Sequence, residues 1–113
     1  MCSKNQLDEI GRRIANKAIE EFGDKLDSVL LYGSYARGDF DSDSDIDIII
    51  VADISDEDAN RIEESLVMFT TNLDLEFDVV ISLYVKGKSN FYKWSNVLPF
   101  YKNVICEGVS LIA

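Results

Sequence analysis

The chain has 113 residues, 47% of them hydrophobic, which suffices for one hydrophobic core, and we expect a single domain over residues 1–113. Its formal net charge of −10, from 21 acidic and 11 basic residues, disfavours binding of free DNA or RNA through phosphates and suits a basic protein partner or bound cations. The chain contains no histidine, which excludes Ser-His-Asp and Cys-His catalysis and the usual histidine ligands of zinc.

The two cysteines, Cys2 and Cys106, are too few for a disulfide framework or a four-thiolate metal site. The N-terminus lacks an apolar signal core, and no apolar run approaches the about 20 residues of a membrane span. We therefore expect a cytoplasmic protein that does not enter a membrane. Its chemistry would rest on carboxylates, hydroxyls, Lys and Arg, backbone groups or a bound metal.

The first third of the chain predicts a helix and then a strand. Apolar residues recur at three- and four-residue steps from Leu7 to Phe22, which predicts an amphipathic helix that ends at Gly23. The apolar run 28–32 predicts a short strand that ends at Gly33.

A second strand, a second helix and a third strand follow. Residues 46–51 are rich in β-branched side chains and predict a strand whose isoleucines at even positions face the core. Ser55 is a typical N-cap for a helix that we expect to end near residues 71–72. The alternation of apolar and acidic residues over 73–82 predicts a third strand.

The last part of the chain predicts only short elements. These are a basic loop at 85–89, an aromatic helical segment at 91–94, a short helix at about 99–106 and an apolar end at 109–111. The order of all elements predicts an α/β (α+β) fold, in which a small mixed β-sheet has helices packed on one side.

The stretch from Gly33 to Val51 carries the most specific chemical pattern. Asp45 and Asp47 lie two positions apart at the start of the predicted second strand, so their carboxylates share one face. Carboxylates at this spacing can bracket two divalent ions about 3.5–4 Å apart, and oxygen-only ligands favour magnesium or manganese. The Gly33-Ser34 turn offers backbone N–H groups and a hydroxyl to phosphate oxygens, and glycine allows a close backbone approach.

Other acidic residues are weaker candidates for the same site. Asp78 would join the pair on one face if the second and third predicted strands are neighbours, and Glu76 stays open as an alternative on that face. Asp74 is expected in solvent. The acidic run 39–43 is expected to be a solvated loop, since Asp and Ser favour turns. No register of this run gives a calcium-binding loop of the EF-hand kind, because glycine is missing at its sixth position and glutamate at its twelfth.

These motifs together resemble a known family. Gly33-Ser34, ten intervening residues and then Asp45-Ile46-Asp47 resemble the signature of the polymerase-beta-type nucleotidyltransferase superfamily. Ala36-Arg37-Gly38 and Ser44-Asp45 match the fuller pattern of its minimal nucleotidyltransferases, and residues 77–80 resemble the strand of the third carboxylate. The resemblance spans nearly the whole chain.

The resemblance implies a polymerase-beta-like nucleotidyltransferase fold and an enzyme that depends on magnesium, with two ions. The implied reaction moves a nucleoside monophosphate, AMP from ATP, to a hydroxyl acceptor and releases pyrophosphate. Tyr35 stands where a basic residue is common in the family, so one phosphate-facing charge is absent here. The implied site residues are Asp45, Asp47 and Asp78 as metal ligands and catalytic groups, and Gly33 and Ser34 as ligands of the nucleotide phosphates. Arg37 is implied either to neutralise charge on these phosphates or to brace the loop.

Family members of this size are often encoded beside a HEPN-type ribonuclease toxin, act as its antitoxin and adenylylate a tyrosine on it. The resemblance therefore implies such a toxin as the protein partner. Two other hypotheses stay open: a non-catalytic antitoxin that neutralises its partner by contact alone, and a nucleotide sensor.

Overall fold

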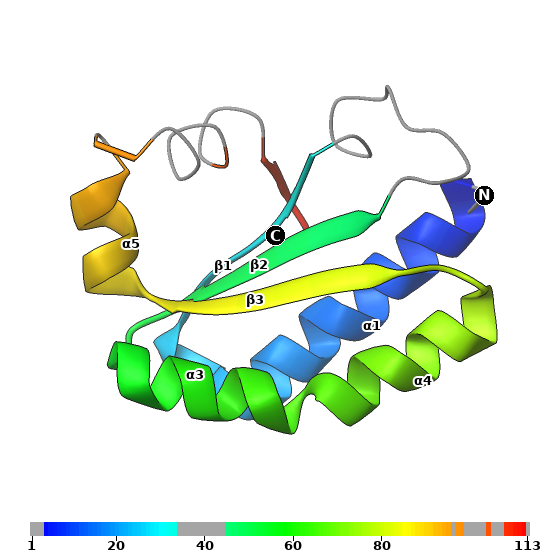
Figure 1. Ribbon diagram of the computed structural model, residues 1–113, viewed down its shortest axis with the longest axis horizontal. Coiled ribbons are helices and arrows are strands. Elements are labelled where there is room, and N and C mark those ends of the chain that lie inside the picture. Colours follow the sequence, from blue (N-terminus) through cyan, green and yellow to red (C-terminus); the bar gives the residue numbers. More distant parts are fainter. Residues whose placement is uncertain (1–3, 34–44, 96, 99–103, 105–107, 113) are drawn as a thin grey trace.

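The structure, a computed structural model, describes residues 4–33, 45–95, 97–98, 104 and 108–112. In this part of the chain, four strands form one mixed sheet in the order β3-β2-β1-β4 (Figure 1). β1 pairs antiparallel with β2 and β4, and β2 pairs parallel with β3. The elements are α1 (Lys4–Phe22), the short helix η1 (Gly23–Lys25), β1 (Leu26–Tyr32), β2 (Ile46–Ala52), α3 (Asp56–Ser65), α4 (Val67–Phe77), β3 (Ile81–Gly87), α5 (Lys88–Trp94) and β4 (Val109–Ser110).

α1 confirms the predicted amphipathic helix. Ile10, Ile14, Ala18 and Phe22 recur every four residues and are buried. Gly23 ends the helix in the left-handed region, with φ of 53°. Although α1 is 19 residues long, neither it nor any other helix in the described ranges is long and apolar enough to cross a bilayer.

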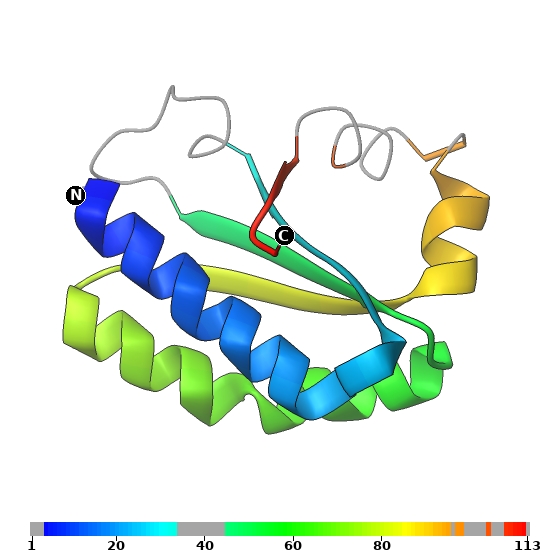
Figure 2. The ribbon, with the colours of Figure 1, turned by 180° about the vertical axis from the view of Figure 1, so that it is seen from behind.

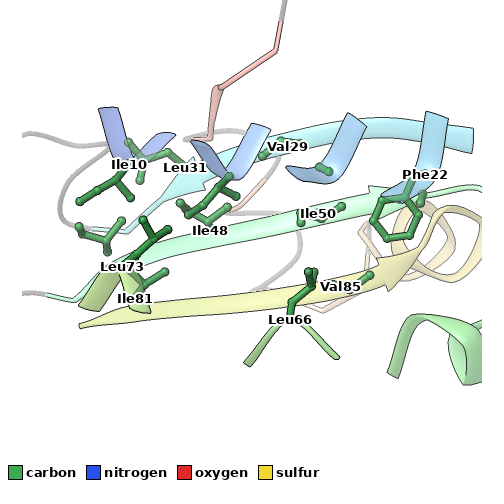
Figure 3. Close-up of a cluster of buried hydrophobic side chains, with 14 of the residues drawn as sticks. Ile10, Phe22, Val29, Leu31, Ile48, Ile50, Leu66, Leu73, Ile81 and Val85 are labelled. Atoms are coloured by element: carbon green, nitrogen blue, oxygen red, sulfur yellow. The ribbon is translucent and has the colours of Figure 1, made fainter. Parts of the chain in front are cut away.

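β1 and β2 confirm the two predicted strands and position the main core. The even-numbered isoleucines of β2 face α1, α3 and α4, which cover one face of the sheet as predicted (Figures 1 and 2). Helix and sheet side chains interdigitate in this core (Figure 3). Its labelled members are Ile10 and Phe22 of α1, Val29 and Leu31 of β1, Ile48 and Ile50 of β2, Ile81 and Val85 of β3, Leu66 at the N-cap of α4, and Leu73 within α4.

A smaller cluster lies on the opposite face of the sheet. It consists of Tyr32, Ile49, Val51, Phe91 and Val104. Phe91 is 1% exposed and is the side chain by which α5 packs against the sheet. The predicted α+β class with a small mixed sheet is therefore confirmed. The prediction that the helices pack on one side holds for α1, α3 and α4, whereas α5 packs on the opposite face through Phe91.

The third predicted strand, 73–82, is wrong in its first half. Residues up to Phe77 belong to α4, and β3 begins only at Ile81. Phe69, Leu73 and Phe77 recur every four residues and contact the main core, so the helical period prevails over the alternation of apolar and acidic residues. Asp78 then ends α4 in the left-handed conformation, with φ of 53°.

Two other boundaries differ from the prediction. Ser55 does cap a helix, since its hydroxyl oxygen accepts the N–H of Asp58 at 3.1 Å, but the helical segment breaks at Leu66 and then runs on to Phe77. The predicted loop 85–89 is wrong, because β3 continues to residue 87 and α5 follows at once. The predicted helix at 99–106 lies outside the described residues except for Val104, as does Cys106.

Carboxylates from α3 and α4 cover the exposed edge of β3. Its outward-facing N–H groups at alternate positions donate to acidic side chains instead of to a further strand, which blunts an edge that could pair with another chain. The donor and acceptor pairs are Ile81 with Asp74 at 3.0 Å, Val85 with Glu63 at 2.8 Å, and Gly87 with Asp56 at 3.2 Å.

We expect Glu63→Ala to lower the free energy of unfolding by about 1–3 kcal/mol, because it leaves the part-buried N–H of Val85 without its acceptor. Glu63→Gln keeps a carbonyl oxygen and should lose less. Urea denaturation provides the measurement, and Glu64→Ala, one residue further along the helix and exposed, provides the control. Equal losses for Glu63→Ala and Glu64→Ala would contradict this role.

Asp27 ties α5 to β1. Its carboxylate accepts the hydroxyl of Tyr92 at 2.7 Å and that of Ser28 at 2.8 Å, and lies 3.5 Å from the ammonium group of Lys88. Burial opposes ionisation of this group, but the two hydrogen bonds and the lysine charge outweigh it and hold the pKa of Asp27 below its ordinary value.

The lowered pKa of Asp27 gives its contribution to stability a defined pH dependence. That contribution is complete above the unfolded-state pKa of about 3.9 and is lost as the pH falls through the lower folded-state pKa. Asp27→Asn should therefore lower the free energy of unfolding by roughly 1 kcal/mol at pH 7 and by progressively less below pH 4. Denaturation from pH 2 to 7 measures this, with the exposed Asp24→Asn as control. A loss independent of pH would refute the linkage.

Candidate functional site

Both predicted carboxylates lie where β2 begins. Asp45 is exposed and immediately precedes the strand, and Asp47 is half-buried as its second residue. Ile46 and Ile48, on either side of Asp47, point into the main core, so Asp47 faces the opposite way, with Ile49 and Val51.

The backbone of Gly33 lies close to the side chain of Asp47. Gly33 follows β1 with φ of 75°, a conformation that side chains disfavour. A Cβ atom at this position would collide with Asp47 Oδ2. Glycine is therefore required here for its conformation and for the space that the carboxylate occupies.

Tyr32 is a neighbour of Asp47 that the sequence did not indicate. It is the cross-strand partner of Asp47 on β1 and is 8% exposed. Burial, and then the negative charge of Asp47 and the proximity of Tyr84, raise the pKa of Tyr32 well above its ordinary value. The phenol of Tyr32 therefore stays protonated beside the carboxylate of Asp47 at neutral pH.

A row of polar side chains on β3 continues this face of the sheet. Ser82 is the register partner of Asp47, and Tyr84 and Lys86 are the partners of Ile49 and Val51. In a parallel pair, register partners lie on the same face, so the row begins beside Asp47. The sequence predicted that the strand beside Asp47 would carry a third carboxylate, but the side chain next to Asp47 is that of Ser82. The misplaced boundary of the third strand concealed this row.

The structure does not place Asp78 on a strand. It lies at the C-terminal cap of α4, is exposed, and precedes β3 by three residues. Among the described residues, no three acidic or cysteine side chains form a group that could hold a metal ion. The predicted position of Asp78 on a strand is therefore wrong, and its role as a third carboxylate stays a prediction.

Two other acidic residues of α4 differ from their predicted surroundings. Asp74 is half-buried rather than in solvent. Its pKa is raised above the ordinary value, mainly by burial and further by the negative charge of Asp45, while the hydrogen bond from the N–H of Ile81 lowers it. Asp74 is thus the α4 carboxylate that interacts with Asp45. Glu76, the predicted rival of Asp78, forms an ion pair with Arg13 at 2.9 Å. The remaining site predictions, Ser34 and Arg37, lie outside the described residues.

A family model described as a nucleotidyltransferase domain matches residues 12–107. The chain belongs to this nucleotidyltransferase family. The match extends from within α1 past α5 and includes Gly33, Asp45, Asp47 and the strands β1, β2 and β3. The predicted family and the enzyme class, nucleotidyltransferase, are confirmed.

Two proteins of Methanocaldococcus jannaschii are similar in sequence, and both have the provisional name protein adenylyltransferase. One is 38% identical over 100 residues, which cover 81% of this nucleotidyltransferase and 92% of the relative. The other is 35% identical over 66 residues, which cover 58% of this chain and 65% of the relative.

Two solved structures resemble the fold. A toxin–antitoxin crystal structure with AMP-PNP has a TM-score of 0.55 at 21% identity, covering 90% of this nucleotidyltransferase and 73% of that chain. A crystal structure of a protein from Sulfolobus solfataricus, provisionally described as a nucleotidyltransferase, has a TM-score of 0.51 at 21% identity. The match covers 93% of this chain and 80% of that chain. At this identity, the likeness shows a shared fold.

The donor groups fit the divalent cation that this fold family implies. Asp45 and Asp47 offer carboxylate oxygens, which suit a hard ion such as magnesium. The carboxylate of Asp47 lies close to the backbone of Gly33, in the space that a side chain at position 33 would fill. The exposed Asp45 is free of the packing that would prevent it from reaching the same ligand.

Proposed function

We propose that this nucleotidyltransferase transfers AMP from ATP to a hydroxyl group of a partner protein in the cytoplasm. The observation that carries this proposal is the close approach of Asp47 to Gly33, next to Asp45, within the region that the family model matches. One relative supports the choice of a protein as acceptor. It has the provisional name protein adenylyltransferase, is 38% identical to this chain, and is matched over 92% of its own length.

The proposed reaction is a substitution at the α-phosphorus of ATP. An oxygen of the acceptor hydroxyl forms a bond to this phosphorus, and the bond from phosphorus to the oxygen that bridges to the β-phosphate breaks. Pyrophosphate leaves with the electron pair of that bond, and the hydroxyl proton passes to a carboxylate base. The product is a phosphodiester between AMP and the acceptor.

Each predicted site residue has a separate task in this proposal. Asp45 and Asp47 would hold two magnesium ions. Bound magnesium supplies positive charge that offsets the charge of the triphosphate. Gly33 and Ser34 would bind phosphate oxygens through backbone N–H groups and a hydroxyl, and Arg37 would add a positive charge.

We propose Asp78 as the third carboxylate and as the base for the acceptor hydroxyl, on the strength of its position in the family motif. Asp74 is its competitor, because it interacts with the charge of Asp45. Asp78→Asn should reduce transfer by about 100-fold and Asp74→Asn by less than tenfold. The reverse order would assign the role to Asp74.

The proposed partner is a HEPN-type ribonuclease toxin, with one of its tyrosines as acceptor and neutralisation of the toxin as the result. The sequence resemblance to minimal nucleotidyltransferases motivates this choice. A structural neighbour with the same fold belongs to a toxin–antitoxin pair that was crystallised with AMP-PNP, which is consistent with it.

To test the partner, purified protein is incubated with magnesium, ATP labelled at the α-phosphate and a candidate HEPN-type toxin from the same organism. We expect label on the toxin, its loss when the acceptor tyrosine is replaced by phenylalanine, and recovery of cell growth only with the active protein. Full protection of cells by an inactive Asp45→Asn/Asp47→Asn variant would instead show that contact is sufficient, and would contradict the catalytic antitoxin.

A further inference from the structure

Charge is distributed unevenly along this acidic chain. Between Asp78 and Glu107 there is no acidic residue, and this stretch contains four lysines. The chain as a whole suits a basic partner, but this segment has the opposite sign. Such an asymmetry points to a second contact surface with different requirements.

The described part of this segment exposes three large aromatic side chains. Tyr84 on β3 is 41% exposed, and Tyr92 and Trp94 on α5 are 42% and 40% exposed. Lys86 lies 6.0 Å from the ring centre of Tyr84, and Lys93 lies 5.3 Å from that of Trp94. We refer to these five residues as the β3–α5 surface.

The β3–α5 surface borders a pocket of about 500 Å³. Its apolar lining includes Val85 and Phe91, which are 0% and 1% exposed, and the partly exposed Trp94. Asp56 also lines the pocket, but its carboxylate accepts the N–H of Gly87 and the side-chain amide of Asn90, so it is already hydrogen-bonded. The pocket can therefore accept an apolar side chain.

Two members of this surface, Tyr84 and Lys86, lie on the sheet face that carries Asp47. Ser82 is beside Asp47 in register, and Tyr84 and Lys86 follow at steps of two residues along β3. These steps correspond to about 7 and 13 Å from Ser82. A partner bound over Lys86 and the pocket would reach the site without spanning the molecule.

We infer that the β3–α5 surface docks the acceptor protein through an acidic segment whose apolar side chain enters the pocket. This inference rests on the proposed function, since it concerns how the acceptor is held. Exposed Trp and Tyr side chains with adjacent cations are the composition of energetically dominant interface positions. Carboxylates of the partner would pair with Lys86 and Lys93, whose positive charges lie over the two rings.

A protein segment fits this surface better than a nucleic acid. Lys88 is held by Asp27 at 3.5 Å, which leaves two lysines of the described surface to meet an incoming anion. A polyanion needs many neutralising contacts, and the net charge of −10 repels it at longer range. A short acidic segment needs only two cationic contacts, and the pocket adds apolar burial.

Trp94 is the only tryptophan in the chain, so its fluorescence reports directly on this surface. The probe is a synthetic peptide of aspartate and glutamate residues around one leucine, without tryptophan, added in the absence of ATP. We expect a saturable change in Trp94 emission and about tenfold weaker binding by Lys86→Glu/Lys93→Glu. The matched control, Lys25→Glu/Arg61→Glu, changes net charge equally at exposed positions and should weaken binding less than about twofold.

Three results would overturn the inference: no change in Trp94 emission, equal binding of a peptide with lysine in place of the acidic residues, or equal weakening by the control variant. Tighter binding of an oligouridine, abolished by Lys86→Glu/Lys93→Glu, would assign the surface to nucleic acid instead. Because binding is measured without ATP, peptide binding by a protein that transfers no AMP would support the docking surface and count against the proposed reaction alone.

Discussion

Replacing Asp45 and Asp47 together by asparagine is expected to reduce AMP transfer by about a thousandfold or more. The two carboxylates lie where β2 begins and are the proposed magnesium ligands. Loss of about 4 kcal/mol of charge stabilisation at the transferring phosphate corresponds to this factor. The measurement is the rate of label transfer from ATP at saturating magnesium.

The fold should survive this double change, because it removes two like charges and no packed apolar group. A matched control is Asp24→Asn/Asp53→Asn, which removes the same charge at two exposed positions outside the site. We expect the control to transfer AMP at a rate within about twofold of the wild type. Equal rates for the two double variants would show that Asp45 and Asp47 do not serve the reaction.

Gly33→Ala is expected to damage both stability and transfer. The alanine would need a φ of 75° and its Cβ would meet the carboxylate of Asp47. The left-handed conformation and the collision together should lower the free energy of unfolding by about 2–4 kcal/mol. A carboxylate displaced by about 1 Å should reduce transfer by about 100-fold. Urea denaturation and the transfer assay measure the two effects.

The chain offers a close control for this variant. Gly23 also has a positive φ, of 53°, but a Cβ there would meet no atom within 4 Å. Gly23→Ala should therefore lose only the conformational part, about 1–2 kcal/mol. In an Asp47→Ala background, where the collision is removed, Gly33→Ala should lose no more than Gly23→Ala does. An undiminished loss in that background would exclude the contact with Asp47 as its cause.

The sequence predicted the elements in which one period of apolar residues dominates. α1 repeats its buried residues at three- and four-residue steps, and β2 alternates between two faces of the sheet. The segment 67–82 contains both patterns. Phe69, Leu73 and Phe77 suit a helix, while alternation from Leu73 onward suits a strand, and packing against the sheet selects the helix. Local sequence could not decide between them, because that selection depends on residues far away in the chain.

The candidate site was predictable to a similar extent. Gly33 and Asp47 come from one motif, and the structure brings them into contact. Tyr32 and Ser82 could not be found from the motif, because they become neighbours of Asp47 only through the registers of β1 and β3. Once the start of β3 is known, alternation alone places Ser82, Tyr84 and Lys86 on the face of Asp47.

Transfer of label from two differently labelled ATP molecules tests the central claim most directly. With magnesium and the candidate toxin as acceptor, ATP labelled at the α-phosphate should leave its label on the acceptor, and ATP labelled at the γ-phosphate should release it in pyrophosphate. Asp45→Asn/Asp47→Asn should abolish the first signal. Label on the acceptor from the γ-phosphate, or none from the α-phosphate, would contradict nucleotidyl transfer by this protein.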